Sequence, residues 1–342
     1  MKRGNTFGCF GGGSRRRSNQ PFRQREGKAH VVEEETEISK GGNSKKRALY
    51  IFDNFFYSHV QLHLMLAKTL SENYFVDILV YSKENGEPIE FNPMPNDLRI
   101  IKMNVDKNQL DQEKIASNKQ GTAYNEFKQS KKYAVGIFED LIKDENQHIL
   151  DHLHQQGYHF GIADLSEMAG SFAIFELLGI KKTFNVLPAI ILPALYQFLG
   201  INIVKQIHER QTIIPARRFP KPGDWVFSTQ RECHFKKDRF TANLDENIVD
   251  ILSTGKYYYD VVSETLANAM NIGDVEQGEF FPNLFKKTSY TFVNQHSYAN
   301  FKNSPVGGKI VHIGGILVEE NEYFRQREQK NVVRIFINSN QN

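Results

Sequence analysis

Residues 48–70 read ALYIFDNFFYSHVQLHLMLAKTL, and this stretch decides the fold. The run Leu49–Phe52 consists of large apolar side chains, which is typical of a buried strand. A short loop over residues 53–57 follows, and the residues after it repeat apolar side chains at the spacing of a helix with one broad apolar face. The stretch therefore predicts a strand, a loop and a helix.

The predicted helix begins at a histidine. Ser58 and Gln61 have the spacing of a capping box, which places the first helical residue at His59. A helix N-terminus carries unpaired N–H groups and a partial positive charge, so a histidine there is biased toward its neutral, proton-accepting form. In open α/β sheets, ligands bind at the carboxyl ends of the strands. His59 is therefore a candidate general base, and the alternative is an ordinary surface histidine in the first turn of a helix.

Length and composition set broad limits on the class of protein. The 342 residues predict two domains, or one large domain with extensions, and an apolar fraction of 40% is enough for a large core. A net charge of +3 is too small to indicate a nucleic-acid partner. Two cysteines, Cys9 and Cys233, cannot form a disulfide framework.

Residues 1–46 differ in composition from the rest of the chain. They contain a glycine-rich stretch (8–13), three arginines (15–17) and three glutamates (33–35), with no apolar run that could serve as a signal peptide. We expect a disordered N-terminal extension. The glycines do not form a dinucleotide fingerprint, because no strand precedes them. A basic arm that contacts a membrane or nucleic acid is the alternative, although the acidic run offsets its charge.

Further along the chain, apolar stretches that resemble strands alternate with stretches of helical spacing. Strands are predicted at residues 76–80, 98–101, 158–164, 182–186, 288–294 and 309–316, and helices at 135–156, 172–178 and 245–270. This alternation predicts an α/β protein with a Rossmann-like, doubly wound parallel sheet. Residues 183–204 are strongly apolar but contain prolines, which favours a strand leading into a pocket-lining or membrane-touching loop over a transmembrane helix.

Asp164 ends one of the predicted strands. In a parallel sheet Asp164 and His59 both lie at carboxyl ends of strands, so they can face one crevice. An imidazole there can take a proton from a hydroxyl group, and a carboxylate can stabilise the imidazolium that forms. The alternative for Asp164 is a loop acid or a helix cap near Ser166.

The spacing of two histidines raises the possibility of a metal site. His59 and His63 are four residues apart, which could place both on one helix face, but no glutamate between them and no cysteine cluster completes a site. No metal is therefore expected. Four more histidines lie close together and are interpreted as part of a solvated helix face: His148, His152, His154 and His159.

Four motifs together resemble those of a known family. They are Ser58-His59, the strand that ends at Asp164 with the following Glu176-Leu-Leu-Gly-Ile180, Phe292-Val-Asn294, and Val311-His-Ile-Gly-Gly-Ile316. In this order they resemble the amino-terminal half of a UDP-glucuronosyltransferase, within the wider UDP-glycosyltransferases. The similarity runs from about Ala48 to about Val318.

The resemblance implies a GT-B glycosyltransferase whose acceptor-binding Rossmann-like domain covers residues 47–318. Residues 319–342 would form a linker and the truncated start of a donor domain. His59 would be the catalytic base and Asp164 the aspartate that supports it. The substrates would be a UDP-sugar, glucuronosyl or glucosyl, and a small lipophilic hydroxylated acceptor, with no cofactor besides this co-substrate.

The resemblance also implies an endoplasmic reticulum membrane location, homo- or hetero-oligomers with relatives, and peripheral membrane contact, with a cytoplasmic location as the alternative. The family's donor signature is absent from the sequence. The isolated chain is therefore expected to be inactive. The competing hypothesis is a non-catalytic acceptor-binding fragment that pairs with full-length relatives.

Overall fold

The computed structural model describes residues 45–130, 132–209, 214, 237–270, 280–296 and 308–316. The expected extension over residues 1–46, apart from Lys45 and Lys46, lies outside these residues. So does the expected linker over residues 319–342.

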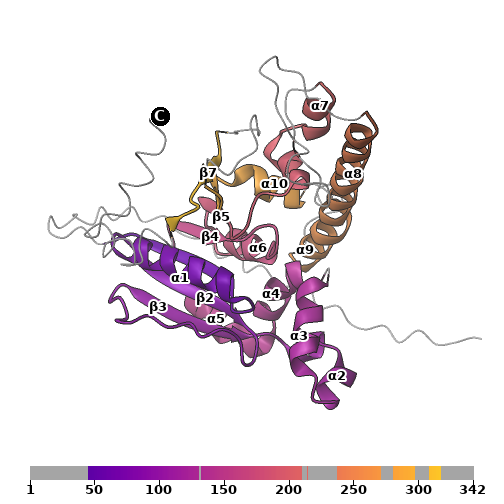
Figure 1. Ribbon diagram of the computed structural model, residues 1–342. Helices are drawn as coiled ribbons and strands as arrows, with labels where there is room; N and C mark the ends of the chain where they lie inside the picture. Colours follow the sequence, from indigo (N-terminus) through magenta and orange to yellow (C-terminus); the bar gives the residue numbers. More distant parts are fainter. Residues whose placement is uncertain are drawn as a thin grey trace, which may run out of the picture. The chain divides into compact units, whose positions relative to one another are not determined.

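Seven strands of the described chain form one sheet in which all neighbours are parallel. They are β1 (Arg47–Asp53), β2 (Phe75–Ser82), β3 (Leu98–Asn104), β4 (Phe160–Ala163), β5 (Thr183–Leu187), β6 (Tyr290–Val293) and β7 (Ile310–His312). Their order is β3-β2-β1-β4-β5-β6-β7 (Figure 1). This is the Rossmann order with one further strand, so the prediction of an α/β, Rossmann-like, doubly wound parallel sheet is confirmed.

The helices occupy the connections between the strands. They are α1 (Tyr57–Ser71), η1 (Lys107–Gln109), α2 (Gln112–Ala116), α3 (Gln120–Gln129), α4 (Tyr133–Leu141), η2 (Asp144–Asn146), α5 (Gln147–His154), α6 (Gly170–Leu177), η3 (Pro193–Leu199), α7 (Ile203–His208), α8 (Lys237–Lys256), η4 (Tyr257–Val262), α9 (Ser263–Ala269) and α10 (Phe280–Lys287).

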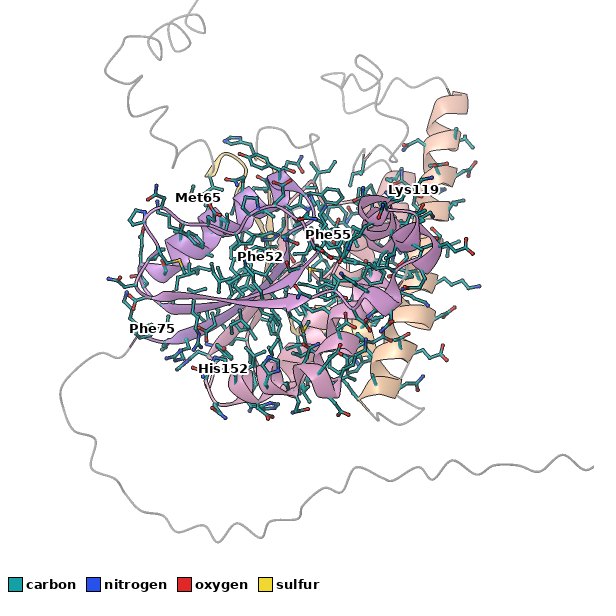
Figure 2. The ribbon with its side chains drawn as sticks, turned by 90° about the horizontal axis from the view of Figure 1, so that it is seen from below. Phe52, Phe55, Met65, Phe75, Lys119 and His152 are labelled. Atoms are coloured by element: carbon teal, nitrogen blue, oxygen red, sulfur yellow. The ribbon has the colours of Figure 1, made fainter. Side chains whose placement is uncertain are left out.

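Successive residues of a strand point to opposite faces of the sheet. In the central strands both faces are covered, so both sets of side chains are buried. On one face, Tyr50 and Phe52 of β1 pack with apolar residues of α1. On the other face, Leu49 and Ile51 belong to a larger core that includes residues of α3, α4 and α6. Figure 2 shows Phe52 among the side chains around the sheet. The continuous apolar run of β1 follows from this burial on both faces.

The start of α1 differs from the prediction. The helix begins at Tyr57 with Phe56 as its N-cap and no side-chain cap, so Ser58 is the second helical residue rather than the cap. The reason lies in Asp53, whose Oδ1 accepts a hydrogen bond from the backbone N–H of Phe55 at 3.0 Å and turns the chain directly after β1. This turn lets the helix begin two residues earlier and leaves His59 in its first turn.

The predicted helix over residues 135–156 is divided into α4 and α5. The side chain of Asn146 donates a hydrogen bond to the carbonyl oxygen of Asp140 at 2.9 Å, in place of the backbone N–H that a continuous helix would supply. The helix predicted at residues 172–178 is confirmed as α6, and Gly179 follows it with a positive φ of 71°.

The apolar residues 183–204 form β5, then a loop, then η3, which confirms the prediction of a strand leading into a pocket-lining segment. Pro193 is the first residue of η3 and Gly200 ends it with a φ of 75°. None of the helices in the described part of the chain combines the length and the apolar character that a membrane-spanning helix needs.

Candidate functional site

The order of the strands reverses at β1. After β1 the chain adds β2 and β3 on one side of it, and then places β4 on its other side, where Tyr50 pairs with Ile162. In such sheets the crevice at the carboxyl ends of the two central strands is where ligands bind. A loop over residues 54–56 follows β1 and a turn over residues 165–167 follows β4, so both segments open onto this crevice.

His59 lies at this edge, in the first turn of α1. Its side chain is half-buried, and its ring packs edge-on against Phe56 with centroids 5.5 Å apart. Burial lowers the pKa of His59 below its ordinary value, Glu167 opposes this effect, and the nearby Lys128 adds to it. The imidazole is therefore neutral at pH 7 and able to accept a proton.

Asp164 follows β4 directly and is buried. Its Oδ1 accepts hydrogen bonds from the backbone N–H of Ser166 at 2.8 Å, from the Ser166 hydroxyl at 2.7 Å and from the N–H of Glu167 at 3.1 Å. Burial, followed by the charge of Glu167, raises the pKa of Asp164 to about 7. The alternative of a capping acid near Ser166 is therefore correct for Oδ1, while Oδ2 forms no hydrogen bond with any described residue.

His59 and Asp164 line one cavity of about 400 Å³. No hydrogen bond joins the two side chains among the residues that the structure describes. The sequence prediction that they face one crevice is thus met, but a direct dyad is not formed. Oδ1 of Asp164 is used by its own turn, and Oδ2 is the oxygen that remains for His59.

The wall of the cavity is mostly apolar. It comes from the loop after β5, from η3, and from the end of α8 with η4. The residues besides His59 and Asp164 are Ser166, Glu167, Leu187, Pro188, Ala189, Ile190, Leu192, Ala194, Leu195, Thr254, Tyr257 and Tyr258. None of the residues that line the cavity is a lysine or an arginine, and two of them, Asp164 and Glu167, are acidic. Such a cavity suits an uncharged apolar molecule with one polar group.

Tyr257 and Tyr258 were not expected from the sequence. They open η4, a π-helical segment between α8 and α9, and such segments often occur at functional sites. The hydroxyl of Tyr258 donates to the carbonyl oxygen of Ser166, which links η4 to the turn of Asp164. The only sequence signal was the three consecutive tyrosines at 257–259 within a helical stretch.

A group of charges lies beside His59, in which Lys128 and Asp53 are buried and Glu167 is partly exposed. Nζ of Lys128 is 2.6 Å from Oδ2 of Asp53 and 2.6 Å from Oε2 of Glu167, and it lies 4.2 Å from the ring centroid of Tyr133. The Tyr133 hydroxyl also donates to Asp53. We refer to Asp53, Lys128, Tyr133 and Glu167 as the Lys128 cluster.

The Lys128 cluster keeps its charges despite burial. Burial alone would lower the pKa of Lys128, but Asp53 and Glu167 outweigh it and raise that pKa. Burial likewise opposes ionisation of Asp53, but Lys128 and Tyr133 hold the pKa of Asp53 below its ordinary value. In the sequence, only the position of Asp53 at the end of β1 weakly indicated a role in the site. Nothing indicated Lys128, because it lies in a polar stretch far along the chain.

His63 is a core residue. Its Nδ1 lies 2.8 Å from the hydroxyl oxygen of Tyr50, and its ring stacks on Phe52 with centroids 4.9 Å apart. Burial lowers the pKa of His63 to about 3. His63 is therefore held in the core by Tyr50 and Phe52.

The remaining histidines of the described chain are exposed or half-buried. Within the described ranges, no three side chains of His, Cys, Asp or Glu are grouped so that they could hold a metal ion. His148 and His154 are exposed, as the interpretation of a solvated helix face requires. His159 is exposed but precedes β4 instead of belonging to α5.

Comparisons with known proteins give structural similarity alone. Neither a protein-family model nor a curated protein matches the sequence. The chain is similar to the apo structure of UGT2 from Phytolacca americana (12% identity, TM-score 0.40, covering 79% of this chain and 52% of that chain). It is also similar to the glycosyltransferase of kitacinnamycin (8% identity, TM-score 0.35, covering 80% and 52%). A third similar structure is TcCGT1 in complex with UDP (11% identity, TM-score 0.35, covering 78% and 54%).

The chain spans about half the length of these three solved structures. Identities of at most 12% and TM-scores of at most 0.40 assign neither a family nor an activity.

Proposed function

We propose that the described domain binds the acceptor of a UDP-sugar-dependent glycosyltransferase of the UDP-glucuronosyltransferase type. The acceptor would be a small lipophilic molecule with a hydroxyl group, and the sugar would be glucuronosyl or glucosyl. One observation above all supports the proposal: a neutral histidine and a buried carboxyl group line the same apolar cavity at the strand-order reversal of the sheet.

In this proposal His59 acts as the general base. A nitrogen of its ring takes the proton of the acceptor hydroxyl while the acceptor oxygen forms a bond to the anomeric carbon of the sugar. The bond from that carbon to the UDP oxygen breaks, its electron pair leaves with UDP, and the configuration at the carbon is inverted. The lowered pKa of His59 fits this role, because the base is unprotonated at pH 7 before the reaction.

Asp164 supports the imidazolium that forms. With a pKa of about 7, Asp164 is near the point at which it exchanges its proton, so a positive charge on His59 would favour its ionised form. Oδ2 has no hydrogen-bond partner in the described part of the chain and is the atom available for this interaction. Bound acceptor or a bridging water would complete the contact between the two groups.

The donor would be held by other groups. A diphosphate is bound by cations and backbone N–H groups, and the cavity beside His59 has no lysine or arginine in its wall and two carboxyl groups. We therefore propose that the 342-residue chain alone binds acceptors without transferring sugar, because transfer needs the donor and the acceptor to be held together.

The alternative function is an acceptor-binding module without catalysis that pairs with full-length relatives. The missing hydrogen bond between His59 and Asp164 in the described structure favours it, since a base and its supporting acid are often in direct contact.

The experiment uses 2-naphthol as the acceptor and the 342-residue chain. We expect calorimetry to detect binding that is lost in Ile190→Glu, which places a charge in the cavity wall, and retained in Val249→Glu. Ile190 and Val249 are similarly exposed, at 56% and 60%, but Val249 is not part of the cavity wall. Equal binding by both variants would contradict the acceptor site.

The same protein is then incubated with labelled UDP-glucuronate or UDP-glucose and 2-naphthol. The proposal predicts no naphthyl glycoside. Product that disappears in His59→Ala would establish His59 as the base but would overturn the claim that the donor is held outside this domain. Naphthol binding without product in a complex with an active relative would favour the non-catalytic module.

A further inference from the structure

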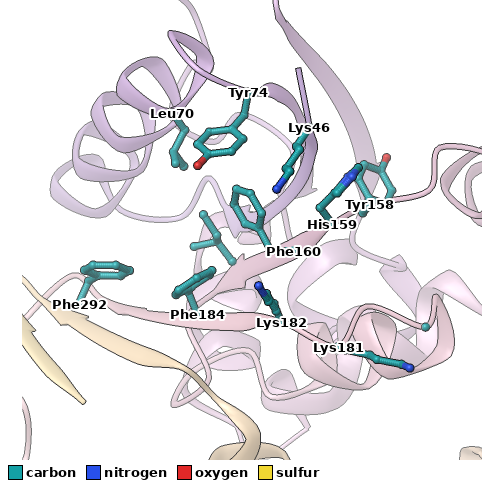
Figure 3. Close-up of a pocket in the computed structure, with 12 residues that line it drawn as sticks. Lys46, Leu70, Tyr74, Tyr158, His159, Phe160, Lys181, Lys182, Phe184 and Phe292 are labelled. Atoms are coloured by element: carbon teal, nitrogen blue, oxygen red, sulfur yellow. The ribbon is translucent and has the colours of Figure 1, made fainter. Parts of the chain in front are cut away.

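A second pocket lies at the opposite edge of the sheet from His59. It has a volume of about 590 Å³ and is lined by twelve residues (Figure 3): Lys46, Leu70, Tyr74, Tyr158, His159, Phe160, Ile162, Gly179, Lys181, Lys182, Phe184 and Phe292. Lys46, His159 and Lys182 directly precede β1, β4 and β5, so the rim of this pocket is formed at the amino ends of the strands. Residues 159 and 164 are separated by about 15 Å of extended strand, which makes this pocket distinct from the cavity of Asp164.

The floor of the second pocket is aromatic. Phe160, Phe184 and Phe292 come from the adjacent strands β4, β5 and β6, and each is half-buried. The Phe160 and Phe184 rings are perpendicular with centroids 5.7 Å apart, and Tyr74 meets Phe160 in the same way at 5.0 Å. A perpendicular arrangement leaves ring faces and edges open to a flat apolar ligand.

The rim of the second pocket is basic. Lys46, Lys181 and Lys182 are exposed, and their ammonium groups form no ion pair or hydrogen bond within the described part of the chain. Figure 3 shows Lys46 and Lys182 extending toward the aromatic rings, whereas Lys181 points away from them. None of the twelve lining residues is acidic. Two ammonium groups without partners beside an apolar floor attract an anion that also has an apolar body.

His159 adds a polar group of defined orientation. Its Nδ1 accepts a hydrogen bond from the backbone N–H of Arg47 at 3.3 Å, so in the neutral ring the proton is on Nε2, which can donate. The pocket thus offers two cations and one N–H donor on its rim, and the floor offers aromatic surface. Its volume is in the range of pockets that bind small molecules.

We propose that this second pocket binds an aromatic carboxylate, with the rings on Phe160 and Phe184 and the carboxylate between Lys46 and Lys182. The aromatic floor favours a flat ring system over a flexible chain, and the lysines favour an anion over a neutral or cationic molecule. This site is independent of the acceptor site proposed above, because the two share no lining residue.

The test compares 2-naphthoate with its neutral isostere 2-naphthamide by calorimetry on the 342-residue chain at low salt. We expect naphthoate to bind about three- to ten-fold more tightly, because two exposed ammonium groups each contribute modestly. The preference should fall as salt is added. In the double variant Lys46→Glu/Lys182→Glu the preference should disappear.

The matched control is Lys102→Glu/Lys119→Glu, which makes the same change in net charge at two exposed lysines outside the pocket. This control should keep the preference for naphthoate. Ile190→Glu, which obstructs the cavity of His59, should leave naphthoate binding unchanged. Equal affinity for naphthoate and naphthamide, or naphthoate binding that is lost in Ile190→Glu and kept in Lys46→Glu/Lys182→Glu, would overturn the proposal.

Discussion

The hydroxyl oxygen of Tyr50 on β1 lies 2.8 Å from Nδ1 of His63 on α1, inside the core between the strand and the helix. The two histidines of α1 therefore have different environments although they are only one turn apart. His63 is buried and packs against aromatic rings, whereas His59 lines the cavity. The bond to Tyr50 gives Nδ1 of the core histidine a hydrogen-bond partner.

The first prediction concerns the stability of the protein in acid. The pKa of His63 is about 3 in the folded protein and near 6.5 in the unfolded chain, so the unfolded state binds more protons between these values. The free energy of unfolding should therefore fall as the pH is lowered from 6.5 to 3. In His63→Gln, whose amide can still bond to Tyr50, this fall should be smaller by an amount on the order of a few kcal/mol.

The measurement for His63 is urea denaturation across this pH range. His152→Gln, at a half-exposed position on α5, serves as the control and should retain the slope of the original protein. An unchanged slope in His63→Gln would contradict the assigned role of His63.

The second prediction concerns Asp164, whose effect on stability changes with pH in the opposite direction to that of His63. Its pKa is about 7 when folded and near 3.8 when unfolded, so the folded state holds a proton that the unfolded state releases. The protein should lose stability as the pH rises from 4 to 8. Asp164→Asn keeps the acceptor oxygen for the turn, and it should be more stable than the original protein at pH 8 and equal to it below pH 4.

Thermal unfolding at a series of pH values measures the effect of Asp164. Asp144→Asn, at an exposed position in η2, provides the comparison. A difference between Asp164→Asn and the original protein that does not grow with pH would show that Asp164 is ionised in the folded state at all these pH values.

The third prediction concerns the Lys128 cluster. Lys128→Met removes the only cation of the cluster and leaves the buried Asp53 carboxylate without it, which should cost about 3–5 kcal/mol of stability. The double variant Lys128→Met/Asp53→Asn should recover part of this loss, because the amide needs no counter-charge. Lys119→Met, at an exposed residue just before α3 that is labelled in Figure 2, should change stability little.

Removal of Lys128 should also change the titration of His59. Lys128 lowers the pKa of His59, while Glu167 and Asp53 raise it. Without the lysine, the pKa of His59 measured by NMR should rise. A rise in Lys119→Met as large as in Lys128→Met would mean that the cluster does not act on His59.

The fourth prediction concerns the binding of 2-naphthol. If the ring of His59 accepts the hydroxyl proton, binding should weaken as the pH falls through the lowered pKa of His59, because an imidazolium has no acceptor nitrogen. His59→Gln should bind naphthol with little pH dependence over this range. His148→Gln, an exposed histidine of α5, should follow the original protein. The same pH dependence in His59→Gln would remove His59 from the acceptor site.

The parts of the structure that could be predicted are those with a local cause. The apolar run of β1 and the periodic apolar face of α1 are properties of adjacent residues, and the position of Asp164 at the end of β4 follows from the same pattern. The start of α1 was predicted wrongly because Asp53 turns the chain before Ser58 can act as a cap. Both the turn at Asp53 and a cap at Ser58 could have started the helix. The turn at Asp53 comes directly after the strand and sets the start of α1.

The parts that could not be predicted depend on contacts between distant segments. Lys128 meets Asp53 across 75 positions of the chain, and nothing in its polar surroundings marks it as buried. The sequence likewise placed His59 and Asp164 at one edge of the sheet but could not tell whether they touch. Side-chain direction at that edge is decided by the turn that Oδ1 of Asp164 holds.

The π-helical segment η4 joins α8 to α9 and carries Tyr257 and Tyr258 into the cavity wall. A π-helical turn contains one residue more than an α-helical turn, and the Ser263 hydroxyl bonds to the Tyr258 carbonyl across five positions at 2.8 Å. Deleting one residue here would replace the wider turn by a regular α-helical turn and change which side chains of this segment face the cavity. The shape of this cavity can therefore change through a single-codon insertion or deletion, with no substitution of any residue that lines it.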